Sequence, residues 1–196
     1  MVSYLRVRMK QTEEQSPSRQ ARIAGLFYLL TIVAGMAGLF FHGRLALATN
    51  LLAGFAYMAV TILFYFIFSA VSRSISLISG AFSILGFIAT TLDWNPLGIN
   101  GLVFFGVYCL LIAYLIFRSS FLPSVLGVLM GLAGLNWLTY LSPYLAKHMH
   151  PYNLIPGLVG EGALTLWLLA VGLNSTRWHE QAQTRTRALE WNKERA

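Results

Sequence analysis

Six long apolar stretches constrain this chain more than any other feature. A helix that crosses the roughly 30 Å hydrocarbon core of a bilayer needs about 20 apolar residues. Each stretch is bounded by a charge, a proline or an Asn/Gly turn, and the apolar residues run on without alternation, which excludes the strands of a membrane barrel. We therefore predict an all-α fold: a polytopic membrane protein with six transmembrane helices in one bundle. The predicted spans are Ile23–Phe41, Leu51–Val71, Ile75–Leu92, Gly98–Phe117, Phe121–Leu141 and Leu154–Leu173.

Composition supports a lipid environment and a single domain. Of the 196 residues 57% are hydrophobic and 11% are charged, whereas soluble domains carry about 25% charged residues. The one cysteine, Cys109, excludes an internal disulfide and a thiolate zinc site. We predict a disordered cytoplasmic tail over residues 1–20, a six-helix transmembrane domain over 21–174 and a second cytoplasmic tail over 175–196. The spacing of apolar residues in that second tail fits a short interfacial helix, and a frayed polar extension is the alternative.

The distribution of Lys and Arg predicts the orientation. Twelve of these residues fall in the two tails and in the loops on the same side, and only Arg44 and Lys147 fall on the opposite side. Positive charge marks the cytoplasmic side, so we predict cytoplasmic N- and C-termini in the cell (inner) membrane. The expected partners are the lipid bilayer and anionic lipid at the cytoplasmic face. We expect no nucleic acid, because no folded basic module with aromatic platforms is present. Protein partners and oligomeric state are not predicted.

Several short motifs resemble a known family. Ala21-Arg22-Ile23-Ala24-Gly25-Leu26-Phe27-Tyr28 opens the first span, the segments 101–106 and 114–119 frame the fourth, and Gly160-Glu161 lies in the sixth. Together these resemble the bacterial multi-pass membrane family catalogued as domain of unknown function 4386, over roughly residues 19–175. The resemblance implies a multi-pass topology and no particular activity. The chain departs from the family at Tyr108, where histidine is more frequent, which argues against a metal or proton site at that position.

Polar and small residues recur on one face of four spans, and such residues rarely face lipid. Packing between helices is one interpretation, and a polar path is the other. Gly127, Gly131 and Gly134 in the fifth span have no polar companion and are interpreted as packing alone. The four faces comprise Tyr28, Thr31, Gly35, Gly38 and His42; Asn50, Gly54, Tyr57, Thr61 and Tyr65; Ser79, Ser83, Gly86, Thr90 and Asp93; and Gly157, Glu161, Thr165 and Gly172.

The strongly polar members of these faces gather towards the outer ends of the spans. This pattern predicts an outward-facing polar pocket that contains Glu161, Asp93, His42, Asn50 and Asn136. Glu161 lies about 10 Å inside its span at 1.5 Å per residue. In a structural interpretation its protonated carboxyl group donates a hydrogen bond to Asn136 or to a carbonyl. In a functional interpretation it carries protons, binds a cation or acts as a general base.

Metal and cofactor sites are weakly indicated at most. His148 and His150, with His42 and Asp93, have the ligand types of an outer zinc or copper site, but loop histidines are commonly just solvated. We therefore predict no metal, with His148 and His150 as the weak candidates. We also expect no cofactor, because no span carries a lysine for retinal or a central histidine for haem.

Three classes of function remain open. The favoured one is an architectural, accessory or sensing membrane protein. The alternatives are a small carrier or channel for an ion or small solute, and a membrane-embedded enzyme with an outward-facing polar site at Glu161. A carrier is expected to show a pocket that continues past Thr31, Tyr57, Thr61 and Ser83 towards the inside. An enzyme is expected to show a dead-end pocket with two or more converging titratable groups, and an architectural protein a dry, closed core. Whether the chain is an enzyme is left undecided by the sequence.

Overall fold

The computed structural model of the chain describes residues 2–91 and 98–195, with side chains described for 17–90, 98–191, 194 and 195. All regular secondary structure among the described residues is helical, and helices make up 85% of this part of the chain. The elements are α1 (Val2–Phe40), α2 (Arg44–Phe68), α3 (Arg73–Thr91), α4 (Gly101–Arg118), α5 (Ser124–Trp137), the 3-10 turn η1 (Leu138–Leu141), α6 (Pro143–Met149), α7 (Leu154–Ala170) and α8 (Ser175–Glu194).

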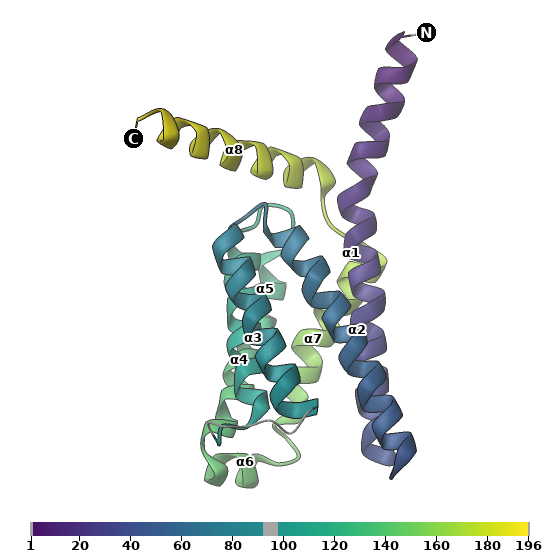
Figure 1. Ribbon diagram of the computed structural model, residues 1–196, viewed down its shortest axis with the longest axis vertical. Coiled ribbons are helices and arrows are strands. Elements are labelled where there is room, and N and C mark those ends of the chain that lie inside the picture. The colour runs from purple at the N-terminus through teal and green to yellow at the C-terminus, as the bar shows by residue number, and fades with distance from the viewer. Residues whose placement is uncertain (1, 92–97, 196) are drawn as a thin grey trace.

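Six of these helices form a closed ring. In sequence order α1 packs on α2, α2 on α3, α3 on α4 and α4 on α5; α5 then packs on α7, which returns to α1. Figure 1 shows the long helices running side by side, with α6 across one end of the bundle and α8 across the other. The ring has an interior to which α1, α2, α4, α5 and α7 all contribute buried side chains.

The outer surface of the ring carries large apolar side chains that would be unfavourable in water. More than thirty Leu, Ile, Val, Phe, Met, Tyr and Trp residues are exposed, among them Leu39, Phe55, Leu77 and Leu166. Such an extensive exposed apolar surface is typical of a protein that is surrounded by lipid. The prediction of an all-α polytopic membrane bundle is confirmed.

The number of membrane-spanning helices is five or six among the described residues. Five helices are long and apolar enough to cross a bilayer, and they cover the first five predicted spans. The sixth predicted span, Leu154–Leu173, coincides with α7, which has 17 residues. Helices α6 and α7 meet at a bend of 80° and count as the sixth span when they are taken together. The short α7 is the element that carries Glu161.

Close helix packing depends on glycine at several contacts. A Cβ atom on Gly134 of α5 would lie 2.9 Å from the carbonyl oxygen of Gly106 on α4, and one on Gly127 would lie 3.2 Å from that of Ala113. A side chain at either position would force the two backbones apart. The interpretation of the α5 glycine face as a packing surface is confirmed.

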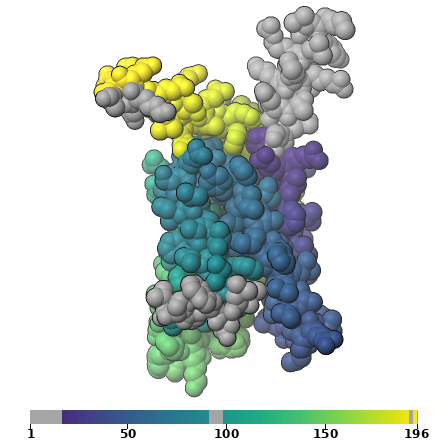
Figure 2. All heavy atoms as spheres, in the orientation of Figure 1, coloured from purple at the N-terminus to yellow at the C-terminus, as the bar shows by residue number. Residues whose placement is uncertain are grey.

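The two tails lie at the same end of the bundle (Figure 1). Helix α1 extends from Val2, so it includes most of residues 1–20, for which we predicted a disordered tail. The C-terminal tail forms α8, and Figure 2 shows α8 lying over the end of the bundle next to α2 and α3. Its contacts are specific: Trp178 Nε1 donates to the Ile67 carbonyl at 2.8 Å, and Gln181 Nε2 donates to the Arg118 carbonyl at 2.9 Å.

Candidate functional site

Glu161 lies in the interior of the helix ring, on the buried face of α7. Its side chain is 8% exposed, and Gly157 and Thr165, one turn away on either side, are buried with it. The same face of α7 packs tightly on α5, because a Cβ atom on Gly160 would lie 2.5 Å from the carbonyl oxygen of Leu129. Helical periodicity and glycine packing thus place this carboxyl group away from lipid.

Two hydrogen bonds from different helices hold the carboxyl group. Trp137 Nε1, at the end of α5, donates to Glu161 Oε1 at 3.0 Å. The hydroxyl group of Tyr28, on α1, bonds Glu161 Oε2 at 3.2 Å. An indole N–H only donates, whereas a phenol hydroxyl both donates and accepts. One oxygen of Glu161 is therefore fixed as an acceptor, and the other has a partner that suits both the ionised and the protonated carboxyl group.

Further buried hydroxyl groups surround this carboxyl group. Tyr57 on α2 and Tyr108 on α4 stack edge to face with their ring centroids 5.7 Å apart, and both lie within electrostatic range of Glu161. In the part of the chain that the structure describes, the hydroxyl groups of Tyr57, Tyr108 and Thr165 have no hydrogen-bond partner. Buried polar groups without partners are rare, and ordered water or an ion commonly satisfies them.

The buried hydroxyl groups continue from this centre towards the α8 end of the bundle. Thr61 Oγ1 donates to the carbonyl oxygen of Tyr57 at 3.0 Å and bonds Ser83 Oγ on α3 at 2.5 Å. One and two turns further along α3 lie Ser79 and Ser76, which are also buried. The hydroxyls of Ser79 and Ser76 bond backbone carbonyls at 2.9 and 2.7 Å. Buried polar groups thus extend from Glu161 past Tyr57, Thr61 and Ser83, and these residues line neither of the two cavities described below.

On the opposite side of Glu161, two asparagines lie within the bundle. Asn136 on α5 is 7% exposed, and its side-chain nitrogen donates to the carbonyl oxygen of Asn153, the residue before α7. The side chain of Asn153 is fully buried, and both of its polar atoms are without partners among the described residues. Asn136 or a carbonyl group was the expected acceptor of a hydrogen bond from protonated Glu161. In the structure the partners of the carboxyl group are Trp137 and Tyr28, and Asn136 bonds Asn153.

The structure brings together some of the predicted pocket residues and not others. Asn136 and Glu161 are both buried between α5 and α7. His42 lies in the α1–α2 turn and Asn50 in the second turn of α2; both are exposed, and Asn50 packs against Gly38. Asp93 lies outside the described residues. An outward-open pocket that holds all five remains a prediction, and the described contacts form a closed arrangement around Glu161.

Two cavities of about 400 and 440 Å³ lie at opposite ends of the bundle, and neither is lined by Glu161 or by the other predicted pocket residues. The first lies beside the beginning of α8. The second lies between the segment 98–100 and η1–α6, with Tyr140 and Lys147 among its lining residues.

The weak metal candidates are separate from the interior site. His148 bonds the carbonyl oxygen of Tyr144 through Nδ1 at 2.9 Å and packs on the Tyr144 ring, and His150 is exposed. Among the described residues, no group of three or more His, Cys, Asp or Glu side chains is positioned to hold a metal ion.

Sequence reasoning did not identify three residues of the interior site. Tyr108 was considered only as a departure from the family, and Trp137 and Asn153 were not among the candidate residues. The helical spacing gave a signal for Tyr108, because Val103, Tyr108, Ile112 and Leu115 share the buried side of α4. Helical spacing gave a comparable signal for Trp137, because Met130, Gly134 and Trp137 share the buried side of α5.

Comparison with known proteins gives one match, to a family model. The family model of DUF4386, a domain of unknown function, matches residues 93–172, the part of the chain that contains α4 to α7 and Glu161. The match confirms the resemblance for this part of the chain, which is narrower than the residues 19–175 expected from the motifs. No curated protein and no solved structure gives a significant match.

Proposed function

We propose that this membrane protein conducts protons, with Glu161 as the central proton-binding group. The observation that carries the proposal is a buried carboxyl group surrounded by buried hydroxyl groups that lack partners among the described residues. Ionisable groups inside a membrane are costly and commonly mark ion or proton pathways. The proposal develops the carrier or channel interpretation of the sequence.

The surroundings of Glu161 favour a proton over a metal cation. Both carboxylate oxygens face hydrogen-bond donors, Trp137 Nε1 and the Tyr28 hydroxyl. These donors occupy positions that a bound cation would need, because hard cations require several free oxygen ligands. A proton needs only one free electron pair on Oε2 and a hydroxyl partner that accepts as well as donates.

The polar groups on either side of Glu161 supply a route in both directions. Tyr57, Thr61, Ser83, Ser79 and Ser76 extend towards the α8 end of the bundle. Asn136 and Asn153 extend towards the α6 end. Hydroxyl groups and bridging waters exchange donor and acceptor roles, so a proton can pass along them without an open pore.

The closed hydrogen bonding of Glu161 favours a second function, an architectural one. Its carboxyl group links α1, α5 and α7 through two side-chain bonds. In that case the residue stabilises the closed ring and carries no proton. The two functions predict different effects of glutamine at this position: proton conduction requires a carboxyl group there, whereas the architectural function requires only the two hydrogen bonds.

The substitution Glu161→Gln separates the two functions because glutamine keeps both hydrogen bonds. Its carbonyl oxygen accepts from Trp137, and its amide nitrogen donates to the Tyr28 hydroxyl. The purified protein is reconstituted into vesicles that contain a pH-sensitive dye, and a potassium gradient with valinomycin drives proton entry. Glu161→Gln should unfold at the temperature of the parent and lower the proton flux at least about tenfold, which is about 1.4 kcal/mol on the barrier.

The matched control is Glu180→Gln, which removes a carboxylate from the exposed surface of α8. This variant should keep the flux of the parent. A parent protein whose flux equals that of empty vesicles contradicts the proposal and leaves the architectural function. Full flux from a folded Glu161→Gln variant contradicts the assignment of Glu161.

A further inference from the structure

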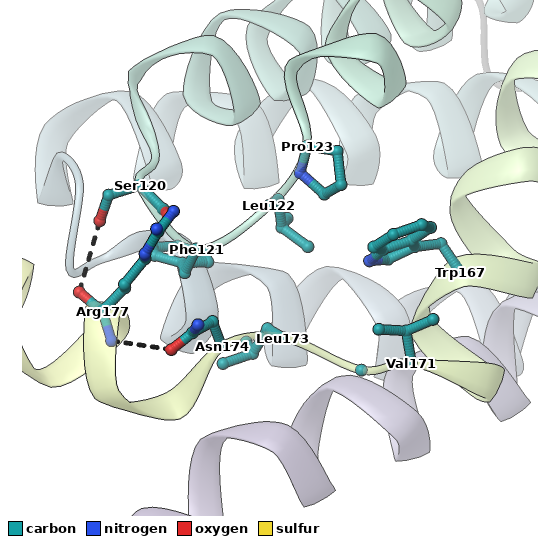
Figure 3. A pocket seen from close by; sticks show the side chains of 10 residues that line it. Ser120, Phe121, Leu122, Pro123, Trp167, Val171, Leu173, Asn174 and Arg177 are labelled. Carbon is teal, nitrogen blue, oxygen red and sulfur yellow. Dashed lines mark hydrogen bonds between the residues drawn. The ribbon is translucent and has the colours of Figure 1, made fainter.

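The cavity of about 400 Å³ beside the beginning of α8 has the lining of a site for an amphipathic anion. It lies between the α4–α5 connection and the end of α7, as Figure 3 shows. Its polar wall includes Ser120, Asn174 and Arg177, and its apolar wall includes Pro123, Trp167 and Val171. The two walls thus offer different chemistry within one cavity.

Arg177 provides most of the positive character of this cavity. Its guanidinium group donates one hydrogen bond, from Nη1 to the Ser120 carbonyl at 3.3 Å, and its side chain extends along the cavity towards Ser120 (Figure 3). Among the described residues no carboxylate pairs with it. A guanidinium group has five N–H donors in a fork that matches phosphate oxygens, so four remain for a ligand.

Two further features add positive potential. The cavity includes the first turn of α8, a 20-residue helix whose positive dipole end attracts anions. Arg22 of α1 lies against Gly172, another lining residue, because a Cβ atom there would lie 3.6 Å from Arg22 Nε. An arginine of α1 thus lies beside one lining residue of the cavity, in addition to Arg177 of α8.

The apolar wall is continuous with the lipid-facing surface. Val171 is exposed at the end of α7, and Trp167 lies one turn before it with its ring towards the cavity (Figure 3). Tryptophan is enriched where the apolar core of a bilayer meets the headgroup layer. A ligand with a phosphate group in the cavity could therefore extend its apolar part along α7 into the bilayer.

We propose that this cavity binds the phosphate headgroup of an acidic phospholipid, with Arg177 as the main phosphate ligand. The acyl chains run along Trp167 and Val171 into the same leaflet as the two tails, which we proposed to be the cytoplasmic one. Its volume suits a headgroup, since small-ligand sites span about 300–1,000 Å³. The inference is independent of proton conduction at Glu161.

Native mass spectrometry of the full-length protein in detergent tests the site with phosphatidylglycerol and phosphatidylcholine as probes. The parent should retain phosphatidylglycerol at least about fivefold more tightly than phosphatidylcholine, and Arg177→Gln should remove that preference. Val171→Phe, which fills the cavity without a change of charge, should weaken binding as well. Arg187→Gln, an exposed site further along α8, should leave binding unchanged.

A second arm separates a lipid headgroup from free phosphate. Inorganic phosphate at millimolar concentration should not displace phosphatidylglycerol from the parent. Displacement by inorganic phosphate overturns the lipid assignment, and equal losses in Arg177→Gln and Arg187→Gln overturn the site in favour of diffuse attraction. Full binding by both Arg177→Gln and Val171→Phe overturns the cavity.

Discussion

The interior around Glu161 and the end of the bundle around α8 are both held together by hydrogen bonds between segments far apart in sequence. In the interior, the carboxyl group of α7 meets donors from α1 and α5, and all three side chains are buried. At the α8 end, Trp178 and Gln181 bond carbonyl oxygens at the ends of α2 and α4, and Arg177 bonds one in the α4–α5 connection.

The difference between the two regions is whether water can replace a lost partner. When a partner is removed in the interior, the remaining buried polar group stays without that hydrogen bond, at a cost in free energy. A carbonyl group at the end of the bundle can bond water once its partner is removed. Substitutions in the interior should therefore cost more stability than those at the α8 end. The interior also has polar groups without partners, at which a substitution should change function and leave stability intact.

The largest expected effect comes from packing next to Glu161. Gly160→Ala places a Cβ atom 2.5 Å from the Leu129 carbonyl oxygen and 2.9 Å from Ala133 Cβ, so α5 and α7 must separate. We expect the free energy of unfolding in mixed micelles to fall by about 3 kcal/mol. Gly162→Ala is the matched control, because a Cβ atom at that position meets nothing within 4 Å. Equal stability of the two variants would contradict the packing of α7 on α5.

The next effect concerns the hydrogen bond from α5 to Glu161. Trp137→Phe keeps an aromatic ring but removes the N–H donor that lies 3.0 Å from Oε1. The carboxyl group then lacks its hydrogen bond to α5, and we expect a loss of about 2 kcal/mol in the free energy of unfolding. Trp191→Phe, at an exposed position on α8, should leave the value unchanged. An equal loss in the free energy of unfolding of both variants would contradict the distinction between the interior around Glu161 and the α8 end of the bundle.

A smaller effect is expected where α8 is attached. Trp178→Phe removes the bond from Nε1 to the Ile67 carbonyl, and that side chain is only partly buried. The expected loss is about 1 kcal/mol, and limited proteolysis should cut residues 175–196 faster than in the parent. Unchanged proteolysis would mean that this bond does not hold α8 on the bundle.

The smallest effect on stability is expected at Tyr57, with a large effect on function. Its hydroxyl group has no partner among the described residues, so Tyr57→Phe should change the free energy of unfolding by less than about 0.5 kcal/mol. If that hydroxyl group is part of the proton route, the flux in vesicles should fall severalfold. Tyr114→Phe, at an exposed site on α4, should keep both the stability and the flux. Full flux in Tyr57→Phe would place the route elsewhere.

The sequence allowed the all-α membrane fold to be predicted because apolar length and continuity depend on local composition. The inward faces of α1, α2, α3 and α7 followed from helical spacing, and Tyr28, Thr61, Ser83 and Glu161 are all buried. The partners of Glu161 did not follow, since spacing within one helix says nothing about which neighbouring helix lies opposite. Tyr28 and Trp137 reach it because the ring closes with α7 between α1 and α5.

The residues of the predicted outer cluster differ in burial for a related reason. Polar residues at the ends of spans resemble pocket residues in sequence, whether they point inward or into water. His42 in the α1–α2 turn and Asn50 near the start of α2 are exposed, whereas Asn136 at the end of α5 and Asn153 before α7 are buried. Asn153 lies at the bend of 80° between α6 and α7 and is fully buried. A bend of this kind depends on tertiary packing that hydropathy does not report.

The most direct test of the central claim is whether Glu161 gains and loses a proton within the folded protein. Difference infrared spectroscopy of the protein in lipid, recorded while the pH of the buffer is cycled, reports the carbonyl stretch of protonated carboxyl groups. The account predicts a reversible carboxyl band that is present in the parent and in Glu180→Gln and absent in Glu161→Gln. A parent spectrum without such a band, or a band that persists in Glu161→Gln, would contradict it.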